Sequence, residues 1–242
     1  FNYKGGQMKN KKIDKYIEEQ SSKLTKGLID RRQFMMSVLA TGVTLPIALS
    51  LADKAVAATP KKGGHLIQAF GHGSTTDQLD PATFENGYQQ NVGFSLGNHL
   101  TEVDNNGQLI PELSTEYSAS PDAKTWTFKL RKGVKWHDGK SFTSDDVAFT
   151  VMNVLKKFHP RGPNSFREVT SIDTPDSHTA IFNLRNPAPY MLRALSAYES
   201  PIVPKHLLEG TDIKSAKLGN NPVGTGPFKF VEWKKGQYIR LD

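Results

Sequence analysis

One stretch of 31 residues, Thr125–Leu155, constrains the fold of this 242-residue chain more than any other, and we call it the hallmark stretch. Its first part alternates apolar and polar side chains, which is the period of a β-strand with one buried face. The sequence therefore predicts a strand, a short interruption at Lys132-Gly133 and a second short strand. The apolar positions of this pattern are Trp126, Phe128, Leu130, Val134 and Trp136.

The second part of the stretch predicts a turn followed by a helix. His137-Asp138-Gly139, which we call the hallmark turn, is typical of a tight turn, because its glycine can adopt a positive φ. Thr143 is a good helix N-cap, and Asp145 and Asp146 place negative charge in the first helical turn. We expect His159-Pro160 to end the helix. The apolar residues at helical spacing are Val147, Val151, Val154, Leu155 and Phe158.

Three segments carry a resemblance to a known family. The first consists of Trp126, Thr127, Phe128, Leu130, Arg131, Gly133, Val134, Lys135, Trp136, His137, Asp138, Gly139, Phe142, Thr143, Asp146, Val147 and Phe149. The second is the segment Asn221–Phe228, and the third is the Ile-Val-Pro-Lys-His segment that ends at His206. Together they resemble the peptide/nickel-type extracellular solute-binding proteins of ABC importers, solute-binding family 5. The resemblance extends over residues 65–242.

The resemblance implies an α/β fold, the two-lobed class II periplasmic-binding architecture. It implies a first lobe from residues 58–97 and 189–242, with a small α/β subdomain, 98–188, inserted into it. Members of this family continue with a second large lobe. We therefore interpret the chain as an incomplete reading frame that holds an incomplete first lobe and its subdomain, with the second lobe missing.

The first 57 residues have the features of an export leader. We interpret Met8 as the true start, with residues 1–7 untranslated. Arg31 and Arg32, followed by Phe34, resemble a twin-arginine export motif, and an uncharged apolar run follows to residue 52. Ala55 and Ala57 fit a small-x-small cleavage site, so the mature protein should begin near residue 58.

Two alternatives to this leader remain open. The apolar run is near the length that spans a bilayer, so it could be an uncleaved anchor. General secretion is the other alternative, because Asp30 and Met36 depart from the usual twin-arginine pattern. The chain has no cysteine, which excludes disulfides, a catalytic thiol and the acylated cysteine of a lipoprotein.

The net charge of +7 does not indicate a nucleic-acid partner. Residues 1–58 carry ten basic and five acidic side chains, whereas residues 59–242 carry 21 and 19. Most of the excess positive charge therefore lies in the leader, and the remainder of the chain is nearly balanced.

A glycine- and hydroxyl-rich loop is the candidate ligand-binding segment. We expect residues His65–Phe70 to form a first strand that is buried on at least one side. The loop that follows offers close backbone approach and hydroxyl groups. In the resembling family this loop lies at the mouth of the ligand cleft, which implies that Gly73, Ser74, Thr75 and Asp77 contact the ligand.

Periodicity and turn residues predict the remaining elements. We expect a helix over Tyr88–Leu100, a hairpin over Glu102–Ile110 and a short helix over Met191–Ser196. We expect an antiparallel pair from Val169–Asp173 and Thr179–Leu184, and strands on both sides of the turn at Lys235-Gly236.

No catalytic or metal motif is evident. His137 and Asp138 are adjacent in a turn and no nucleophile is near them in sequence, so a general base is not indicated. A helix N-terminus explains Asp145 and Asp146 without a metal. The seven histidines include no pair at i, i+3 or i, i+4. We expect no enzymatic activity, no metal and no cofactor.

The resemblance implies the periplasmic substrate-binding component of an ABC importer, which captures di- or oligopeptides and delivers them to membrane permease subunits. The export machinery, twin-arginine or general, would be a further partner. A nickel chelate, haem or an oligosaccharide is an alternative ligand. An exported hydrolase whose active site lies outside this chain is an alternative from a different class.

Overall fold

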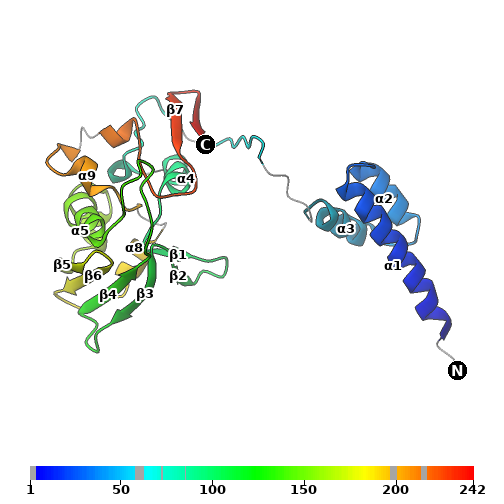
Figure 1. Cartoon of the computed structure of the whole chain (residues 1–242), viewed down its shortest axis with the longest axis horizontal. Coiled ribbons are helices and arrows are strands. Elements are labelled where there is room, and N and C mark those ends of the chain that lie inside the picture. Colours follow the sequence, from blue (N-terminus) through cyan, green and yellow to red (C-terminus); the bar gives the residue numbers. More distant parts are fainter. Residues whose placement is uncertain (1–3, 58–62, 72, 85, 197–200, 214–216) are drawn as a thin grey trace. The chain divides into compact units, whose positions relative to one another are not determined.

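The computed structural model describes residues 4–57, 63–71, 73–84, 86–196, 201–213 and 217–242 (Figure 1). The chain divides into two compact units, Phe1–Gln68 and Ala69–Asp242. Each unit has its own apolar core and is described by itself below.

The described residues of the first unit form three helices, α1 (Lys4–Thr25), α2 (Arg31–Leu39) and α3 (Leu45–Ala57). Gly42, with φ +89°, lies between α2 and α3, so the apolar run of the leader forms two helices rather than one. The side chains buried between the three helices are Leu24, Phe34, Val38, Ala48, Ala52 and Ala55. Each helix in the described part of the chain is too short or too polar to serve as a membrane span.

The predicted strand at His65–Phe70 is wrong. These residues adopt no regular structure, and Leu66 and Ile67 are 83% and 92% exposed. A strand is stabilised by hydrogen bonds to a neighbour, and none of the sheets formed by the described residues includes this segment. A short, largely apolar run alone therefore did not make a strand here.

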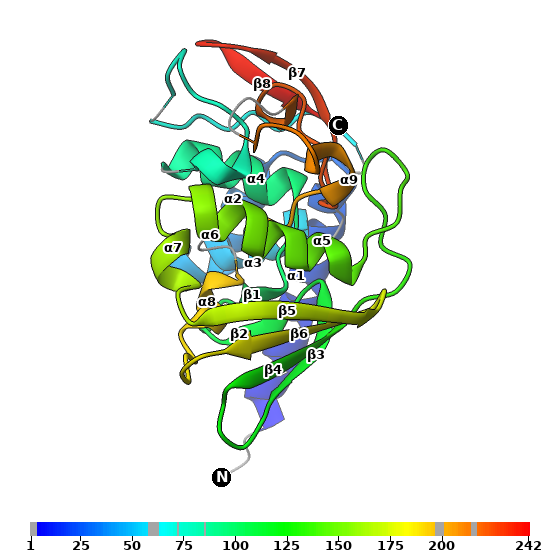
Figure 2. The same ribbon diagram turned by 90° about the vertical axis from the view of Figure 1, so that its left-hand side faces the viewer.

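The second unit is built around a four-stranded antiparallel sheet in the order β3-β4-β6-β5. Its strands are β3 (Ser114–Ala119), β4 (Thr125–Leu130), β5 (Val169–Asp176) and β6 (Thr179–Leu184). Figure 2 shows helix α5 (Ser144–Phe149) lying across one face of this sheet. The main core fills the space between them, and its aromatic members are Trp126, Phe128, Trp136, Phe142, Phe166 and Phe182.

The hallmark stretch folds largely as its sequence predicts. The apolar positions of β4 face the core and its polar positions are half-buried or exposed. The turn at residues 137–139 is present, with Gly139 at φ +89°. The predicted second strand is wrong, because only an isolated bridge between Lys135 and Ser141 forms there. Trp136 is nevertheless buried.

The helix that follows the turn has an irregular middle. After α5 the chain continues as a π-helical segment, η2 (Thr150–Leu155), and then as α6 (Lys156–Phe158). The Thr150 hydroxyl donates to the Asp146 carbonyl at 2.7 Å where the π segment begins. The helix ends before His159, as predicted.

The remaining elements surround this sheet and helix. They are η1 (Pro81–Thr83), α4 (Gly87–Leu96), β1 (Thr101–Val103), β2 (Leu109–Pro111), α7 (Gly162–Ser165), α8 (Met191–Ala194), α9 (Lys205–Leu208), η4 (Lys217–Gly219), β7 (Phe230–Lys234) and β8 (Tyr238–Leu241). The predicted hairpins and the short helix near residue 191 are confirmed. The helix predicted to reach Leu100 ends at Leu96, because Gly97 is extended at φ −134° and ψ 161°.

His159 should make stability depend on pH. Burial, together with the charge of Arg161, lowers the pKa of this histidine from about 6.5 to about 4. The unfolded chain therefore binds a proton more readily than the folded chain in this range. We expect the free energy of unfolding to fall by about 1–3 kcal/mol as the pH drops from about 6.5 to about 4. Urea unfolding at pH 7 and pH 4.5 measures this change.

The variant His159→Gln provides the control. Its side chain does not titrate, so its stability should vary less over the same pH interval. An unchanged pH dependence in that variant would assign the effect to other groups.

Candidate functional site

The loop that contains the predicted ligand residues is exposed and internally bonded. The Asp77 carboxylate accepts a hydrogen bond from the backbone N–H of Ser74 at 2.7 Å, and the hydroxyls of Ser74 and Thr76 lie 2.8 Å apart. Gly73, Ser74 and Thr75 are exposed. The structure therefore brings the predicted residues together in one turn, whose hydroxyl groups and backbone face solvent. His72 of this loop lies outside the described residues.

The loop lies against the hairpin of β7 and β8. The Lys235 ammonium donates to the carbonyl of Asp77 at 3.3 Å, and its Nζ lies 4.6 Å from the centre of the Trp233 ring. Phe70 and Tyr88 form an edge-to-face pair with ring centres 6.1 Å apart. Burial and the charge of Asp77 raise the pKa of Tyr88. The polar loop thus borders an aromatic surface that the sequence did not connect with it.

The hallmark turn is hydrogen-bonded to the second family segment, which lies 87 residues later in the chain. The backbone N–H of His137 donates to the Gly224 carbonyl at 2.9 Å, and its Nε2 donates to the Gly226 carbonyl at 3.0 Å. Its Nδ1 accepts from the Gly224 N–H at 3.3 Å. Both ring nitrogens are therefore engaged with backbone, which assigns His137 a structural role.

The neighbouring Asp138 joins the turn to the third family segment. Its carboxylate lies 2.7 Å from Nε2 of His206, and both side chains are about a quarter exposed. Partial burial opposes ionisation of Asp138, but the hydrogen bonds from His206 and from the backbone of Lys140 outweigh it, so its pKa lies below the usual value. The three family segments therefore meet at one place through polar contacts.

Asp146 fixes the start of α5, and its removal should be costly. The buried carboxylate accepts from the backbone N–H groups of Thr143 at 2.8 Å and Lys205 at 2.9 Å. Hydrogen bonds to a charged group contribute about 1.5–3 kcal/mol each. Thr143 and Lys205 are half-buried, so water partly replaces the lost acceptor. We therefore expect Asp146→Ala to lower the free energy of unfolding by about 2–3 kcal/mol in urea titrations, less than the sum of the two bonds.

The adjacent carboxylate provides a matched comparison. Asp145 is 54% exposed and contacts the Thr174 hydroxyl and the Lys205 ammonium. Because such solvent-exposed contacts contribute little, Asp145→Ala should cost less than about 1 kcal/mol. Equal losses in the two variants would contradict the capping role of Asp146.

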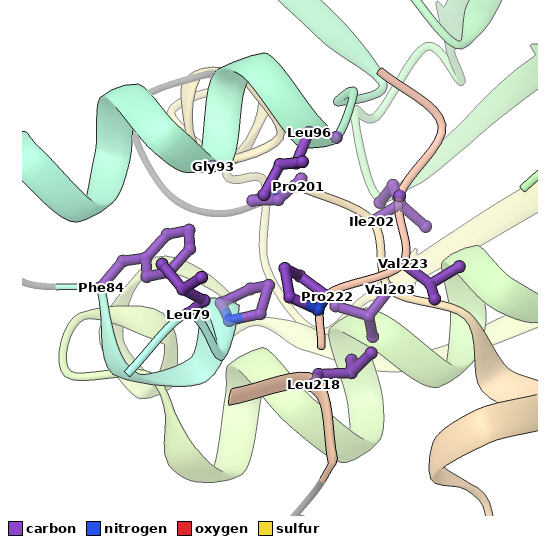
Figure 3. A pocket seen from close by; sticks show the side chains of 13 residues that line it. Leu79, Phe84, Gly93, Leu96, Pro201, Ile202, Val203, Leu218, Pro222 and Val223 are labelled. Atoms are coloured by element: carbon purple, nitrogen blue, oxygen red, sulfur yellow. The ribbon is translucent and has the colours of Figure 1, made fainter. Parts of the chain in front are cut away.

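An apolar cavity near α4 is too small for a solute. It encloses about 20 Å³, enough for about one water molecule. Figure 3 shows its wall of apolar side chains, which come from residues 79–84, from α4 and η4, and from or beside the two later family segments. The labelled residues are Leu79, Phe84, Gly93, Leu96, Pro201, Ile202, Val203, Leu218, Pro222 and Val223. It is a packing gap in the core.

The predicted export residues lie in the first unit. Arg31 donates to the Asp53 carboxylate at 2.8 Å, while Arg32 is exposed. Phe34 and Ala55 are buried among the helices. Ala57 is the last residue of α3; its side chain and the predicted mature start near residue 58 lie outside what the structure describes.

The sequence model of the family described as bacterial extracellular solute-binding proteins, family 5, matches residues 108–242. This match spans more than half of the chain and includes all three family segments. The chain belongs to this family. The predicted resemblance is therefore confirmed.

Curated and solved family 5 proteins align with most of the chain. The oligopeptide-binding protein AppA of Bacillus subtilis is 30% identical over 88% of the chain, and the chain spans 41% of the length of AppA. The structure of AppA with a nonapeptide superimposes with a TM-score of 0.62 at 28% identity, over 70% of this chain and 34% of AppA.

A second solved family 5 protein has a different ligand. The structure of NikZ from Campylobacter jejuni with Ni(L-His) superimposes with a TM-score of 0.59 at 31% identity, over 68% of this chain and 33% of NikZ. These structures confirm the predicted α/β periplasmic-binding fold over the matched part. The chain therefore spans about 40% of the curated relative and about a third of the solved structures.

One group of possible metal ligands was missed at the sequence level. His99, Glu102 and Glu112 lie close together in the second unit. A register for the hairpin of β1 and β2 would have placed Glu112 opposite the start of β1, which is the only signal for this group in the sequence.

Proposed function

We propose that this chain is part of the substrate-binding component of an ABC importer, and that it captures di- or oligopeptides outside the cytoplasmic membrane and delivers them to permease subunits. Membership of family 5 carries this proposal. The alignment with a protein named for oligopeptide binding favours peptides as the ligand class.

We place the ligand surface at the loop Gly73–Asp77. Its exposed hydroxyls and backbone suit the amide groups of a peptide, which offer donors and acceptors without regard to side chains. The aromatic surface beside it, with Tyr88 and Trp233, suits apolar peptide side chains. We retain the division into a first lobe, residues 58–97 and 189–242, and an inserted subdomain, residues 98–188.

The mechanism proposed is cleft closure. Binding proteins of this kind exchange between open and closed arrangements of two lobes, and a ligand that binds the closed arrangement more tightly shifts the population toward it. The loop would contribute one side of the cleft. No bond in the solute is made or broken in this mechanism.

A metal chelate is the second candidate ligand, favoured by the likeness to NikZ with Ni(L-His). The hydrolase alternative has less support. His137, the residue that most resembles a general base, engages both ring nitrogens with backbone groups.

Ligand identification tests the proposal directly. The protein purified from its own organism under mild conditions is denatured, and the released small molecules are identified by mass spectrometry. We expect short peptides, and micromolar or tighter rebinding in calorimetry. Release of a nickel chelate instead would favour the second candidate, and hydrolysis of the added peptides would contradict a transport role.

We propose export by the twin-arginine route as well, on the basis of Arg31, Arg32 and Phe34. Replacing both arginines with lysine keeps the positive charge. We expect this double variant to leave nearly all of the protein in the cytoplasm, as measured by cell fractionation and immunoblotting. Undiminished export would favour general secretion. N-terminal sequencing of the exported protein tests cleavage after Ala57.

A further inference from the structure

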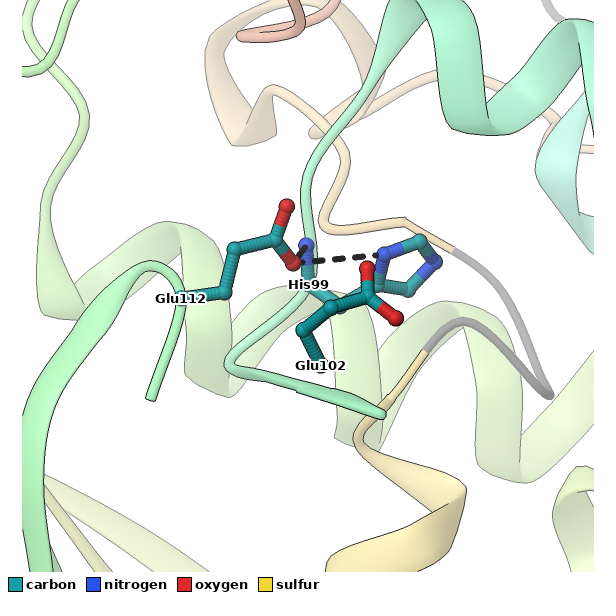
Figure 4. A group of neighbouring side chains, drawn as sticks. All are labelled: His99, Glu102 and Glu112. Carbon is teal, nitrogen blue, oxygen red and sulfur yellow. Dashed lines mark hydrogen bonds and ion pairs between the residues drawn. The ribbon is translucent and has the colours of Figure 1, made fainter. Parts of the chain in front are cut away.

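His99, Glu102 and Glu112 form a compact group at the base of the hairpin of β1 and β2. One ligand atom from each residue lies within 4.8 Å of the other two. The group is assembled by backbone pairing, since the N–H of Leu113 donates to the carbonyl of His99 at 2.9 Å. Figure 4 shows the two carboxyl groups gathered on the Nδ1 side of the imidazole ring.

Glu112 is held in place for this arrangement. Its Oε2 accepts from the backbone N–H of His99 at 2.6 Å, and its Oε1 accepts from the side-chain amide of Asn98 at 2.6 Å. One oxygen of Glu102 accepts from the backbone N–H of Val103 at 2.8 Å. Hydrogen bonds of this kind orient ligands and reduce the rearrangement that metal binding requires.

The imidazole of His99 is buried without a good hydrogen bond. Its side chain is 1% exposed. Nδ1 lies 3.5 Å from Glu112 Oε2, too long for a strong hydrogen bond, and among the described residues Nε2 has no hydrogen-bond partner. Adjacent ligands of a tetrahedral zinc ion are about 3.4 Å apart, given bonds of about 2.0–2.1 Å. The Nδ1–Oε2 distance therefore suits a shared metal better than a direct hydrogen bond.

The charge of the group favours a cation. Two carboxylates approach each other here, and in the described part of the chain neither has a lysine or arginine as an ion-pair partner. The nearby Arg131 donates through Nε to the backbone carbonyl of Glu112 rather than to its carboxylate. Like charges in a partly buried place are destabilising unless an opposite charge compensates them.

We propose that His99 Nδ1 and the carboxylates of Glu102 and Glu112 bind a divalent metal ion of borderline softness, with Zn²⁺ as the best match. One imidazole and two carboxylates are a donor set that zinc accepts, and three protein ligands leave a fourth position for water. The ion would tether the segment that leaves α4 to strand β2. The site shares no residue with the loop Gly73–Asp77 and does not depend on the proposed function.

Calorimetric titration of the tag-free chain with zinc chloride tests the proposal. We expect one ion per chain and a melting temperature that rises with zinc concentration. Glu102→Gln should weaken binding at least 10-fold, because the neutral amide is a poorer ligand of similar shape. Glu102 is partly exposed, so this variant should fold. X-ray absorption of the zinc complex should show one imidazole nitrogen and otherwise oxygen ligands.

Glu116→Gln is the matched control, since this exposed glutamate lies on the neighbouring strand β3 and belongs to no such group. It should bind zinc like the unaltered chain. The proposal is overturned if Glu102→Gln binds zinc as well as the control, or if the unaltered chain binds no zinc at submillimolar concentration. Equal affinity for Mg²⁺ would also overturn it, because the imidazole would then have no role.

Discussion

Replacing Gly224 with alanine should lower the free energy of unfolding by about 3–5 kcal/mol, as measured by urea or thermal denaturation. A Cβ atom at this position would overlap the backbone carbonyl of Leu96 and would lie 3.2 Å from Gly97 Cα. Neither obstacle is a flexible side chain. The backbone of Gly224 is also bonded on both sides by His137, so it cannot move away without losing those hydrogen bonds.

Gly87→Ala serves as the control. Gly87 is the first residue of α4, and nothing lies within 4 Å of a Cβ built there. Alanine is the better helix former, so this variant should be neutral or more stable by up to about 1 kcal/mol. If Gly224→Ala unfolds at the same urea concentration as Gly87→Ala, the close approach of the second family segment to α4 is incorrect.

Trp136→Ala should cost about 3–5 kcal/mol, the range for removing a large aromatic side chain from a core. The indole is 2% exposed and lies edge-to-face with Phe142 and with His206, at centre distances of 6.1 and 6.4 Å. Its loss would leave a cavity between the hallmark turn and the third family segment. Chemical denaturation followed by circular dichroism measures the loss.

Two further variants separate packing from hydrogen bonding at this position. The indole N–H has no acceptor among the described residues. Trp136→Phe should therefore cost clearly less than Trp136→Ala, about 1–2 kcal/mol, because most of the ring contact survives and no hydrogen bond is lost. Phe228→Ala removes a 47%-exposed ring and should change stability by less than about 0.5 kcal/mol. Comparable losses at positions 136 and 228 would refute the burial of Trp136.

Local sequence rules were sufficient wherever an element depends on its own residues. Strand β4 follows from alternation, the turn at residue 139 from glycine, and the start of α5 from Thr143 and Asp146. The hairpin of β1 and β2 follows from Asp104–Gly107, where Gly107 has φ +77°. Each signal concerns residues within about four positions of one another, which is the range of local propensity and capping.

The failures concern contacts between distant residues. The segment 65–70 is a short, largely apolar run of the kind that forms buried strands, but it lacks a paired neighbour in the described sheets. The end of α4 is set by Gly97, whose surroundings come from Pro201 and the second family segment. The group around His99 depends on hairpin register. Gly97 is itself a local helix-stop signal that the prediction overlooked. The missing strand at 65–70 and the group around His99 have no local signal, since both depend on tertiary pairing.

For the proposed ligand loop, the sequence placed four residues in one turn, and the structure adds their neighbours. Lys235 and Trp233 come from a hairpin about 160 residues later in the chain, so no spacing rule could connect them with Asp77. The family resemblance supplied the location of this loop, whereas its aromatic border emerged only from the arrangement in space.

The hydrogen bonds between His137 and the segment Gly224–Gly226 also constrain when the protein can complete its fold during synthesis. The four strands of the sheet can pair as soon as residue 184 has been translated, because all of their pairing partners lie within that length. The imidazole of His137 can form its hydrogen bonds only after about 40 further residues, when Gly224 and Gly226 have been translated. At translation rates of about 5–20 residues per second, this delay is about 2–8 seconds. A nascent chain therefore passes through a stage in which the turn at residues 137–139 lacks its hydrogen bonds to Gly224 and Gly226.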